Sequence, residues 1–231
     1  MTRTLATVKG LGTVKQADGN FYECLQELGS TQLIKTRDEA YARLQTRRNK
    51  NVGQSQGTWT RTGFEYVAGK LPIVRVDNSR LLNKQLAKRA VKSNSNGNYF
   101  HTSSTAEYEE SLELAEKDRN KDPAKRRVIV LPSRQDFTLD SADDETLQAL
   151  LKDQAKPYFE MHGPMRVYLI NSSTVDDQDG TLMTELWFDS TDYRSDLYGD
   201  SRDLYYDDGT RGVFKSAEGA STQKSNTKTS L

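Results

Sequence analysis

The sequence predicts an α+β fold. Short apolar runs of β-forming residues alternate along the chain with stretches in which apolar residues recur at helical spacing. The 231 residues include 2 Trp, 11 Tyr and 7 Phe, which is enough apolar volume for a real core. No run approaches the ~18 apolar residues that a membrane-spanning helix needs, so we expect no membrane span.

The first hundred residues predict short strands followed by two helices. Residues 1–36 are broken by glycines and are expected to form short strands and turns. Thr36 is a candidate cap for a helix over residues 38–47. Aromatic and β-branched residues then predict strands within residues 57–76. A polar cap predicts a further helix over about residues 81–91.

The rest of the chain continues the alternation. Ser104 and Glu107 have the spacing of a capping box and predict the start of a helix. The pattern beyond it predicts, in order, a buried strand, a helix and two strands: residues 127–131, 142–155, 165–170 and 183–188. In residues 189–213, apolar residues follow neither the spacing of a helix nor the alternation of a strand clearly.

The predicted organisation has three parts. An N-terminal segment of strands and a helix covers residues 1–56. The main α+β domain covers residues 57–213. Residues 214–231 are rich in Ser, Thr and Lys and are predicted to be a disordered tail.

Charge is unevenly divided along a chain whose formal net charge is zero. Residues 1–100 carry 17 Lys or Arg against 7 Asp or Glu, and the remaining residues carry 16 against 26. Either the two halves pack on each other, or the basic half meets an acidic partner such as nucleic acid. The second hypothesis would use a basic cluster with aromatic residues nearby for stacking: Arg43, Arg47, Arg48 and Lys50, with Trp59, Phe64 and Tyr66.

Motifs for catalysis and metal binding are missing from the sequence. Its two histidines, His101 and His162, belong to no zinc-ligand spacing. No phosphate-binding glycine loop is present. The acidic run at residues 176–180 cannot be an EF-hand, because two required ligand positions are apolar. We therefore expect neither an enzyme nor a bound cofactor or metal.

The cellular location is expected to be the cytoplasm or a virion. Cys24 is the single cysteine, so no intrachain disulfide can form. Secreted small domains usually depend on disulfides. The first eleven residues contain no apolar core of a signal peptide.

The segment 188–213 has an unusual composition. It contains four of the eleven tyrosines, seven aspartates and three arginines. Tyrosine supplies large, rigid contact area, and Asp, Ser and Gly supply adaptable polar contacts, as in antibody binding loops. A solvated, turn-rich region would explain the same composition.

Five residue types are missing from this segment. Lys, Glu, Gln, Met and Trp make up 47 of the 231 residues, yet none occurs in residues 188–213. Pyrimidine-ended asparagine codons that are altered at their first two bases never encode these five types. The exclusion therefore indicates a segment diversified from such codons.

The order of motifs resembles a known fold. A strand ending in Val130-Leu131-Pro132-Ser133 leads to a helix, then to a strand with Trp187, a loop-rich stretch and the closing Arg211-Gly212-Val213. This order resembles C-type-lectin-fold proteins of the formylglycine-generating-enzyme type. The variable proteins of diversity-generating retroelements are built on this fold. The resemblance covers about residues 127–213 and, more weakly, residues 57–126, and so implies a C-type lectin-like domain over residues 57–213.

The resemblance implies a small antiparallel-sheet scaffold and a C-terminal variable region, about residues 187–213, that binds a macromolecular target, in the first place a protein. The display set that it implies for ligand binding is Asp189, Ser190, Asp192, Tyr193, Arg194, Asp196, Tyr198, Asp200, Ser201, Asp203, Tyr205, Tyr206, Asp207 and Asp208. The scaffold that it implies is Trp187, Leu197, Leu204, Arg211, Gly212 and Val213.

Two other functions remain open at this point. The basic half would suit a nucleic-acid-associated protein, whose affinity would fall steeply with salt. A structural protein of a viral particle would instead bury the tyrosine-rich segment in a subunit contact. The sequence does not identify the ligand, the source or the oligomeric state.

Overall fold

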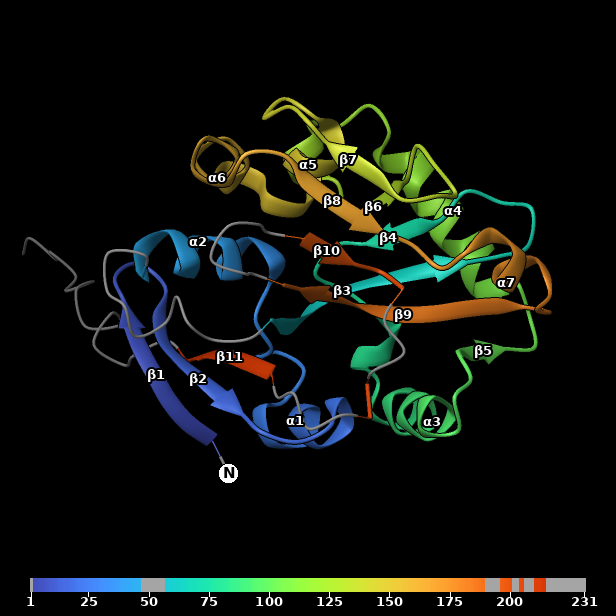
Figure 1. The fold of residues 1–231 in the computed structure, drawn as a ribbon, viewed down its shortest axis with the longest axis horizontal. Helices are drawn as coiled ribbons and strands as arrows, with labels where there is room; N and C mark the ends of the chain where they lie inside the picture. The colour runs from blue at the N-terminus through green and yellow to red at the C-terminus, as the bar shows by residue number, and fades with distance from the viewer. Residues whose placement is uncertain (1, 47–56, 190–195, 201–203, 206–209, 215–231) are drawn as a thin grey trace, which may run out of the picture.

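The described part of the chain is built around one sheet of eleven strands (Figure 1). The computed structural model describes residues 2–46, 57–189, 196–200, 204–205 and 210–214. The main path of the sheet is β1-β2-β11-β3-β9-β10-β8-β7, and β4 pairs with β3, β6 with β4 and β5 with β9. Helices accompany this sheet, so the predicted α+β class is confirmed.

The strands differ in one respect from the expected small antiparallel sheets. They join a single mixed sheet, in which the pairings of β8 with β10 and of β3 with β11 are parallel. The strand bounds are β1 (Thr2–Val8), β2 (Gly12–Ala17), β3 (Thr58–Tyr66), β4 (Ile73–Arg75), β5 (Phe100–Thr102), β6 (Val128–Val130), β7 (Phe137–Leu139), β8 (Met165–Tyr168), β9 (Thr181–Phe188), β10 (Asp196–Tyr198) and β11 (Thr210–Phe214).

The helices are mostly short. None in the described ranges is long and apolar enough to cross a membrane. Their bounds are α1 (Phe21–Leu28), α2 (Thr36–Thr46), α3 (Lys84–Ser95), α4 (Ala106–Asp118), α5 (Glu145–Leu151), α6 (Ala155–His162) and α7 (Ser172–Asp176), with 3₁₀ turns η1 (Arg80–Leu82), η2 (Pro123–Lys125) and η3 (Lys152–Gln154).

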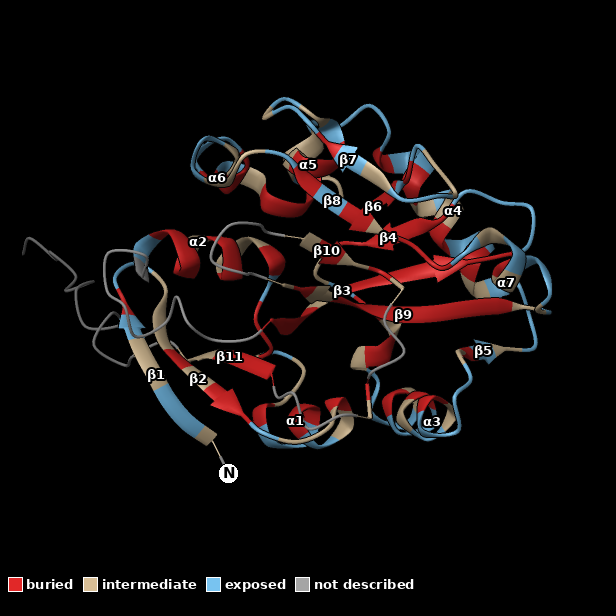
Figure 2. Ribbon diagram, in the orientation of Figure 1, coloured by how far each residue is buried: buried red, intermediate tan, exposed pale blue. Residues whose placement is uncertain are grey.

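The central strands β3 and β9 are buried almost throughout (Figure 2). Apolar clusters cover them from two sides. The larger cluster contains Phe64, Leu150 and Tyr158 and involves α5 and α6. The second contains Phe21 and Trp59 and involves α1 and α3. Burial on both faces explains why these strands lack a clear apolar–polar alternation in the sequence.

Helix α1 was not predicted, although its signal is present in the sequence. Asn20 Oδ1 accepts a hydrogen bond from Glu23 N, and Glu23 Oε2 accepts one from Asn20 N, both at 3.1 Å. This is a complete capping box. Phe21, Leu25 and Leu28 then lie on one face and are buried. The expectation of only strands and turns over residues 1–36 is therefore wrong.

Two helix boundaries also differ from the prediction. The capping box expected at Ser104 does not form: α4 begins at Ala106 with Thr105 at its cap position, and Glu107 Oε2 accepts a hydrogen bond from the Thr102 hydroxyl at 3.2 Å. Ser104 Oγ instead accepts one from Ala106 N at 3.0 Å. The helix predicted over residues 142–155 is divided: α5 ends, a 3₁₀ turn follows, and the unpredicted α6 begins.

Strand β11 lies between β2 and β3, so the C-terminal strand joins the N-terminal hairpin to the rest of the sheet. Gln32 O accepts a hydrogen bond from Val213 N at 2.8 Å, and Ile34 N donates one to Arg211 O at 2.9 Å. The predicted boundary after residue 56 falls outside the described residues. Strands from both sides of it share this one sheet.

A buried ionic cluster fixes β11 to α2. The Glu39 carboxylate forms ion pairs with Arg43, at 2.7 Å, and with Arg211. Arg43 Nη2 also donates a hydrogen bond to Phe188 O at 2.7 Å. Burial raises the pKa of Glu39, but the two guanidinium groups outweigh it and hold that pKa below its ordinary value. Glu39 is therefore ionised in the folded protein.

Candidate binding surface

The display set is only partly within the described residues. Its described members are all half-buried: Asp189, Asp196, Tyr198, Asp200 and Tyr205. The others lie outside the described residues: Ser190, Asp192, Tyr193, Arg194, Ser201, Asp203, Tyr206, Asp207 and Asp208.

The scaffold set divides into buried and half-buried residues. Leu197 and Leu204 are 0% and 1% exposed. Arg211 and Gly212 in β11 are also buried, whereas Val213 is half-buried. Trp187 is half-buried as well, and its ring contacts the buried Trp59 edge-on.

Hydrogen bonds to main-chain atoms fix the first part of the candidate binding segment, residues 187–213. Asp189 N donates a hydrogen bond to Asp196 O at 3.0 Å, which links the end of β9 to the start of β10. Gly199 N donates to Tyr168 O at 2.9 Å. The Tyr66 hydroxyl donates to Gly199 O at 2.9 Å, and the Thr184 hydroxyl donates to the same oxygen. These bonds do not depend on which side chain a display position carries.

Two further main-chain anchors hold the continuation of the segment. The Tyr99 hydroxyl donates a hydrogen bond to Asp200 O at 3.0 Å. Phe21 N, at the start of α1, donates to Leu204 O at 2.9 Å. The unpredicted helix α1 therefore contributes directly to positioning the candidate binding segment.

Close packing requires a glycine at position 199. A Cβ atom at this position would lie 2.7 Å from Phe64 ring atoms and 2.8 Å from the Tyr66 hydroxyl. Real Cβ atoms do not approach ring atoms so closely, so a side chain here would displace the core. The segment thus alternates fixed positions, such as Gly199, with half-exposed ones, such as Tyr198.

An aromatic row crosses four strands. Tyr168, Tyr198, Trp187 and Trp59 are direct neighbours in the register of β8, β10, β9 and β3. The Tyr168 and Tyr198 rings stack at 4.5 Å with an angle of 8° between their planes. The row passes from half-buried residues to a fully buried one. A rigid aromatic surface of this kind suits protein recognition.

Charged groups border the outer end of this row. The Arg166 guanidinium lies 4.8 Å from the Tyr168 ring centre and pairs with Asp136 at 3.3 Å. Asp196 Oδ1 accepts a hydrogen bond from Arg166 N at 3.4 Å. Burial, reinforced by Asp196, raises the pKa of Tyr198 to about 12, so its hydroxyl stays protonated and can donate to a ligand.

The sequence did not reveal three of these contributors: Tyr99, Arg166 and Tyr168. Each lies far from residues 187–213 along the chain, and each reaches the segment only through the fold. The sequence predicted a strand over residues 165–170, but not which strand would be its neighbour.

The basic cluster proposed for nucleic acid is not assembled as expected. Trp59, Phe64 and Tyr66 are each at most 2% exposed and cannot stack on bases. Arg43 is buried and paired with Glu39. The expectation for these four residues is therefore wrong. Arg47, Arg48 and Lys50 lie outside the described residues.

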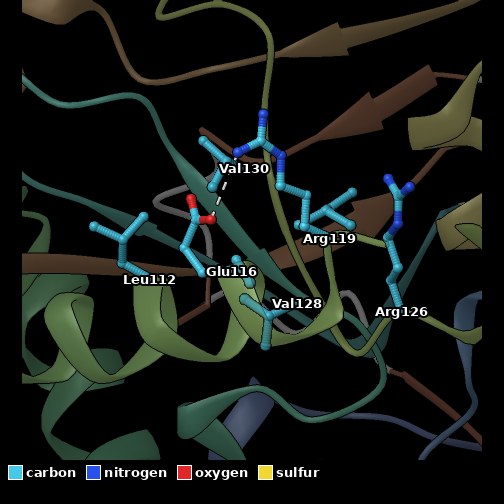
Figure 3. A pocket seen from close by; sticks show the side chains of 8 residues that line it. Leu112, Glu116, Arg119, Arg126, Val128 and Val130 are labelled. Atoms are coloured by element: carbon cyan, nitrogen blue, oxygen red, sulfur yellow. Dashed lines mark ion pairs between the residues drawn. The ribbon is translucent and has the colours of Figure 1, made fainter. Parts of the chain in front are cut away.

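A separate hollow of about 360 Å³ lies between α4 and β6 (Figure 3). Leu112, Val128 and Val130 form apolar parts of its wall. Arg119 at its edge pairs with Glu116 at 3.8 Å. None of the described residues of segment 187–213 lines this hollow. No metal-binding group of three or more His, Cys, Asp or Glu occurs in the ranges that the structure describes.

Structural comparison identifies the fold. The chain is similar to a solved structure that was described as showing how the C-type lectin fold accommodates massive sequence variation in Nanoarchaeota. The TM-score is 0.58, and the match covers 90% of this chain and 99% of the other at 14% sequence identity. This chain therefore has a C-type lectin fold. By sequence, no protein-family model and no curated protein matches it.

Proposed function

We propose that this chain is a ligand-binding display protein, that residues 187–213 form its target-binding surface, and that it is a variable protein of a diversity-generating retroelement. The target is a macromolecule, in the first place a protein. The protein acts by binding and catalyses no reaction.

One observation carries this proposal above all. The segment is held by hydrogen bonds to its own main-chain atoms at Asp189, Gly199, Asp200 and Leu204. Its apolar anchors are buried, and the described display residues between them are half-exposed. Such a frame keeps its shape when the display side chains change, which is what a varied binding surface needs.

Two further observations support the same proposal. The absence of Lys, Glu, Gln, Met and Trp from residues 188–213 fits codons diversified at adenines. The similar structure was described for its accommodation of massive sequence variation by this fold.

The DNA around the gene tests the origin of the segment. We expect a reverse-transcriptase gene nearby and an imperfect copy of the codons for residues 187–213, differing almost only at adenines. The codons for the display set should match asparagine codons in that copy. Flanking DNA without such a copy would contradict the retroelement origin.

A library tests the display surface independently. The display positions are replaced by mixed pyrimidine-ended codons, and the fraction of folded, protease-resistant variants is measured. A control library varies Leu197, Gly199 and Leu204 in the same way. We expect most display variants and few control variants to fold. Equal losses in both libraries would mean that the display residues belong to the core.

A further inference from the structure

The solvent face of α3 carries a row of cations that form no ion pair with the residues that the structure describes. Lys84, Lys88, Arg89 and Lys92 are all exposed. The helix contains no acidic residue. None of these four side chains takes part in an ion pair within the described residues. Fourteen other Lys or Arg side chains there do form ion pairs: Arg37, Arg43, Arg75, Arg80, Lys117, Arg119, Lys121, Lys125, Arg126, Arg127, Arg134, Lys152, Arg166 and Arg211.

The spacing of these cations is regular. Lys84, Lys88 and Lys92 are separated by four residues each, so they follow one side of the helix at intervals of about 6 Å. This interval is comparable with the separation of neighbouring phosphates along one nucleic-acid strand. Arg89 is held beside the row, with its guanidinium 5.2 Å from the centre of the Phe100 ring.

A hollow of about 410 Å³ continues the row at the end of α3. It is lined by Arg89, Lys92, Ser93, Asn96, Phe100 and His101. Basic side chains, hydroxyls and amides are the groups that contact phosphate and sugar oxygens in nucleic-acid complexes. The row and the hollow together form one cationic surface on α3 and β5.

We propose that this α3 surface binds nucleic acid through its phosphate backbone and without base-specific contacts. Phe100 is 4% exposed, so it offers no ring on which a base could stack. The apolar residues Leu86 and Val91 are only half-exposed and give the helix no apolar face for insertion into a lipid surface. An acidic protein partner would be expected to meet an apolar patch at the centre of the interface, which this surface lacks.

This surface differs from the one that the sequence suggested. It uses none of Arg43, Trp59, Phe64 or Tyr66, which are buried. None of its four cations belongs to the display set, and their replacement leaves residues 187–213 unchanged in sequence, so this proposal is tested independently of the proposed target-binding function.

Fluorescence anisotropy of the full chain with a fluorescein-labelled duplex DNA of mixed sequence tests the proposal. We expect binding whose logarithmic affinity falls against the logarithm of salt concentration with a slope of about −3 to −4, as four phosphate contacts require. The variant K84Q/K88Q/R89Q/K92Q should bind at least roughly tenfold more weakly at low salt and show a slope near zero.

A matched control removes the same number of charges elsewhere. The variant K70Q/K117Q/R119Q/K125Q changes four exposed cations outside α3 and should bind as the unchanged protein does. The melting temperatures of both variants are measured alongside.

Three results would overturn the proposal. The first is no anisotropy change at about 50 mM salt, where backbone contacts are strong. The second is equal weakening in both variants, which would reflect net charge alone. The third is tighter binding of polyglutamate than of the DNA at equal charge concentration, which would indicate an acidic protein as the partner.

Discussion

The buried carboxyl of Glu185 in β9 shows how one residue can set the pH dependence of stability. It is fully buried, and the Ser79 hydroxyl donates a hydrogen bond to its Oε2. Burial raises the pKa of Glu185 well above its ordinary value, and the nearby Arg61 lowers it only in part. Burial therefore favours the neutral form of this carboxyl in the folded protein.

Replacing this group with its neutral analogue should remove that dependence. In the unfolded chain Glu185 ionises near its ordinary pKa, so folding is increasingly opposed as the pH rises above about 4.5. We expect the melting temperature of Glu185→Gln, relative to the unchanged protein, to increase from pH 5 to pH 8. A difference that does not vary with pH would show that the carboxyl is ionised in both states.

Cys24 in α1 gives a second residue-scale prediction. Its Sγ lies 3.3 Å from the carbonyl oxygens of Ala17 and Gly19, and burial raises its pKa to about 12. The thiolate is the reactive form. Iodoacetamide at pH 8 should therefore modify Cys24 only as fast as the protein unfolds, as mass spectrometry can follow. Rapid modification of native protein would mean that α1 detaches from the sheet.

Two neighbouring residues, Tyr198 at the end of β10 and Gly199 directly after it, should separate stability from binding. Gly199→Ala places a methyl group against Phe64 and Tyr66 and should destabilise the fold by about 1–3 kcal/mol. Tyr198→Ala removes a half-exposed ring and should cost only about 1 kcal/mol of stability, while weakening target binding. Thermal unfolding of both variants checks this. A larger loss for Tyr198→Ala would place that ring in the core.

At the scale of elements, the contact between α2 and β11 depends on one carboxylate. Glu39→Gln would leave Arg43 and Arg211 buried without their negative partner, and losing one member of such a cluster costs about 3–5 kcal/mol. Because the folded pKa of Glu39 is lowered, this stabilisation is present above about pH 4.5 and is lost as the pH falls below it. Denaturant unfolding at pH 7 and pH 4 should therefore give a larger difference between the two proteins at pH 7.

The same contact shows what sequence reasoning could reach. Strand β6 and helix α3 follow from local patterns. The strand predicted over residues 127–131 forms over Val128–Val130, and the helix predicted over about residues 81–91 forms three to four residues later, over Lys84–Ser95. The pairing of Glu39 with Arg211 joins residues far apart in the chain, and no local pattern encodes it. In the sequence, Glu39 is only an acidic residue in the first turn of a helix, where such residues are common.

The candidate site was predictable to a similar extent. Its segment could be located by composition, and Leu197 and Leu204 stand out as apolar residues within a polar stretch. The contributions of Tyr168 and Tyr99 depend on which strands become neighbours. That pairing is decided by the whole sheet, so it could not be derived from the segment itself.

At the scale of the whole molecule, the sheet makes the N-terminal segment part of the binding domain. β2 pairs with β11, and Phe21 N donates a hydrogen bond to Leu204 O. A chain that starts at residue 57 should therefore fail to fold cooperatively, as circular dichroism during thermal unfolding would show. A sharp transition near that of the full chain would instead support an independent domain over residues 57–213.

The central position of β11 in the sheet also makes folding depend on complete translation of the chain. Residues 189–209 precede β11 in the reading frame, so a frameshift or stop codon there would delete the strand that joins β2 to β3. The truncated product could not close its sheet and would expose two unpaired strand edges, which makes a chain prone to aggregation or degradation. Only chains translated in frame through residues 189–209 to the end of β11 can therefore form the complete sheet.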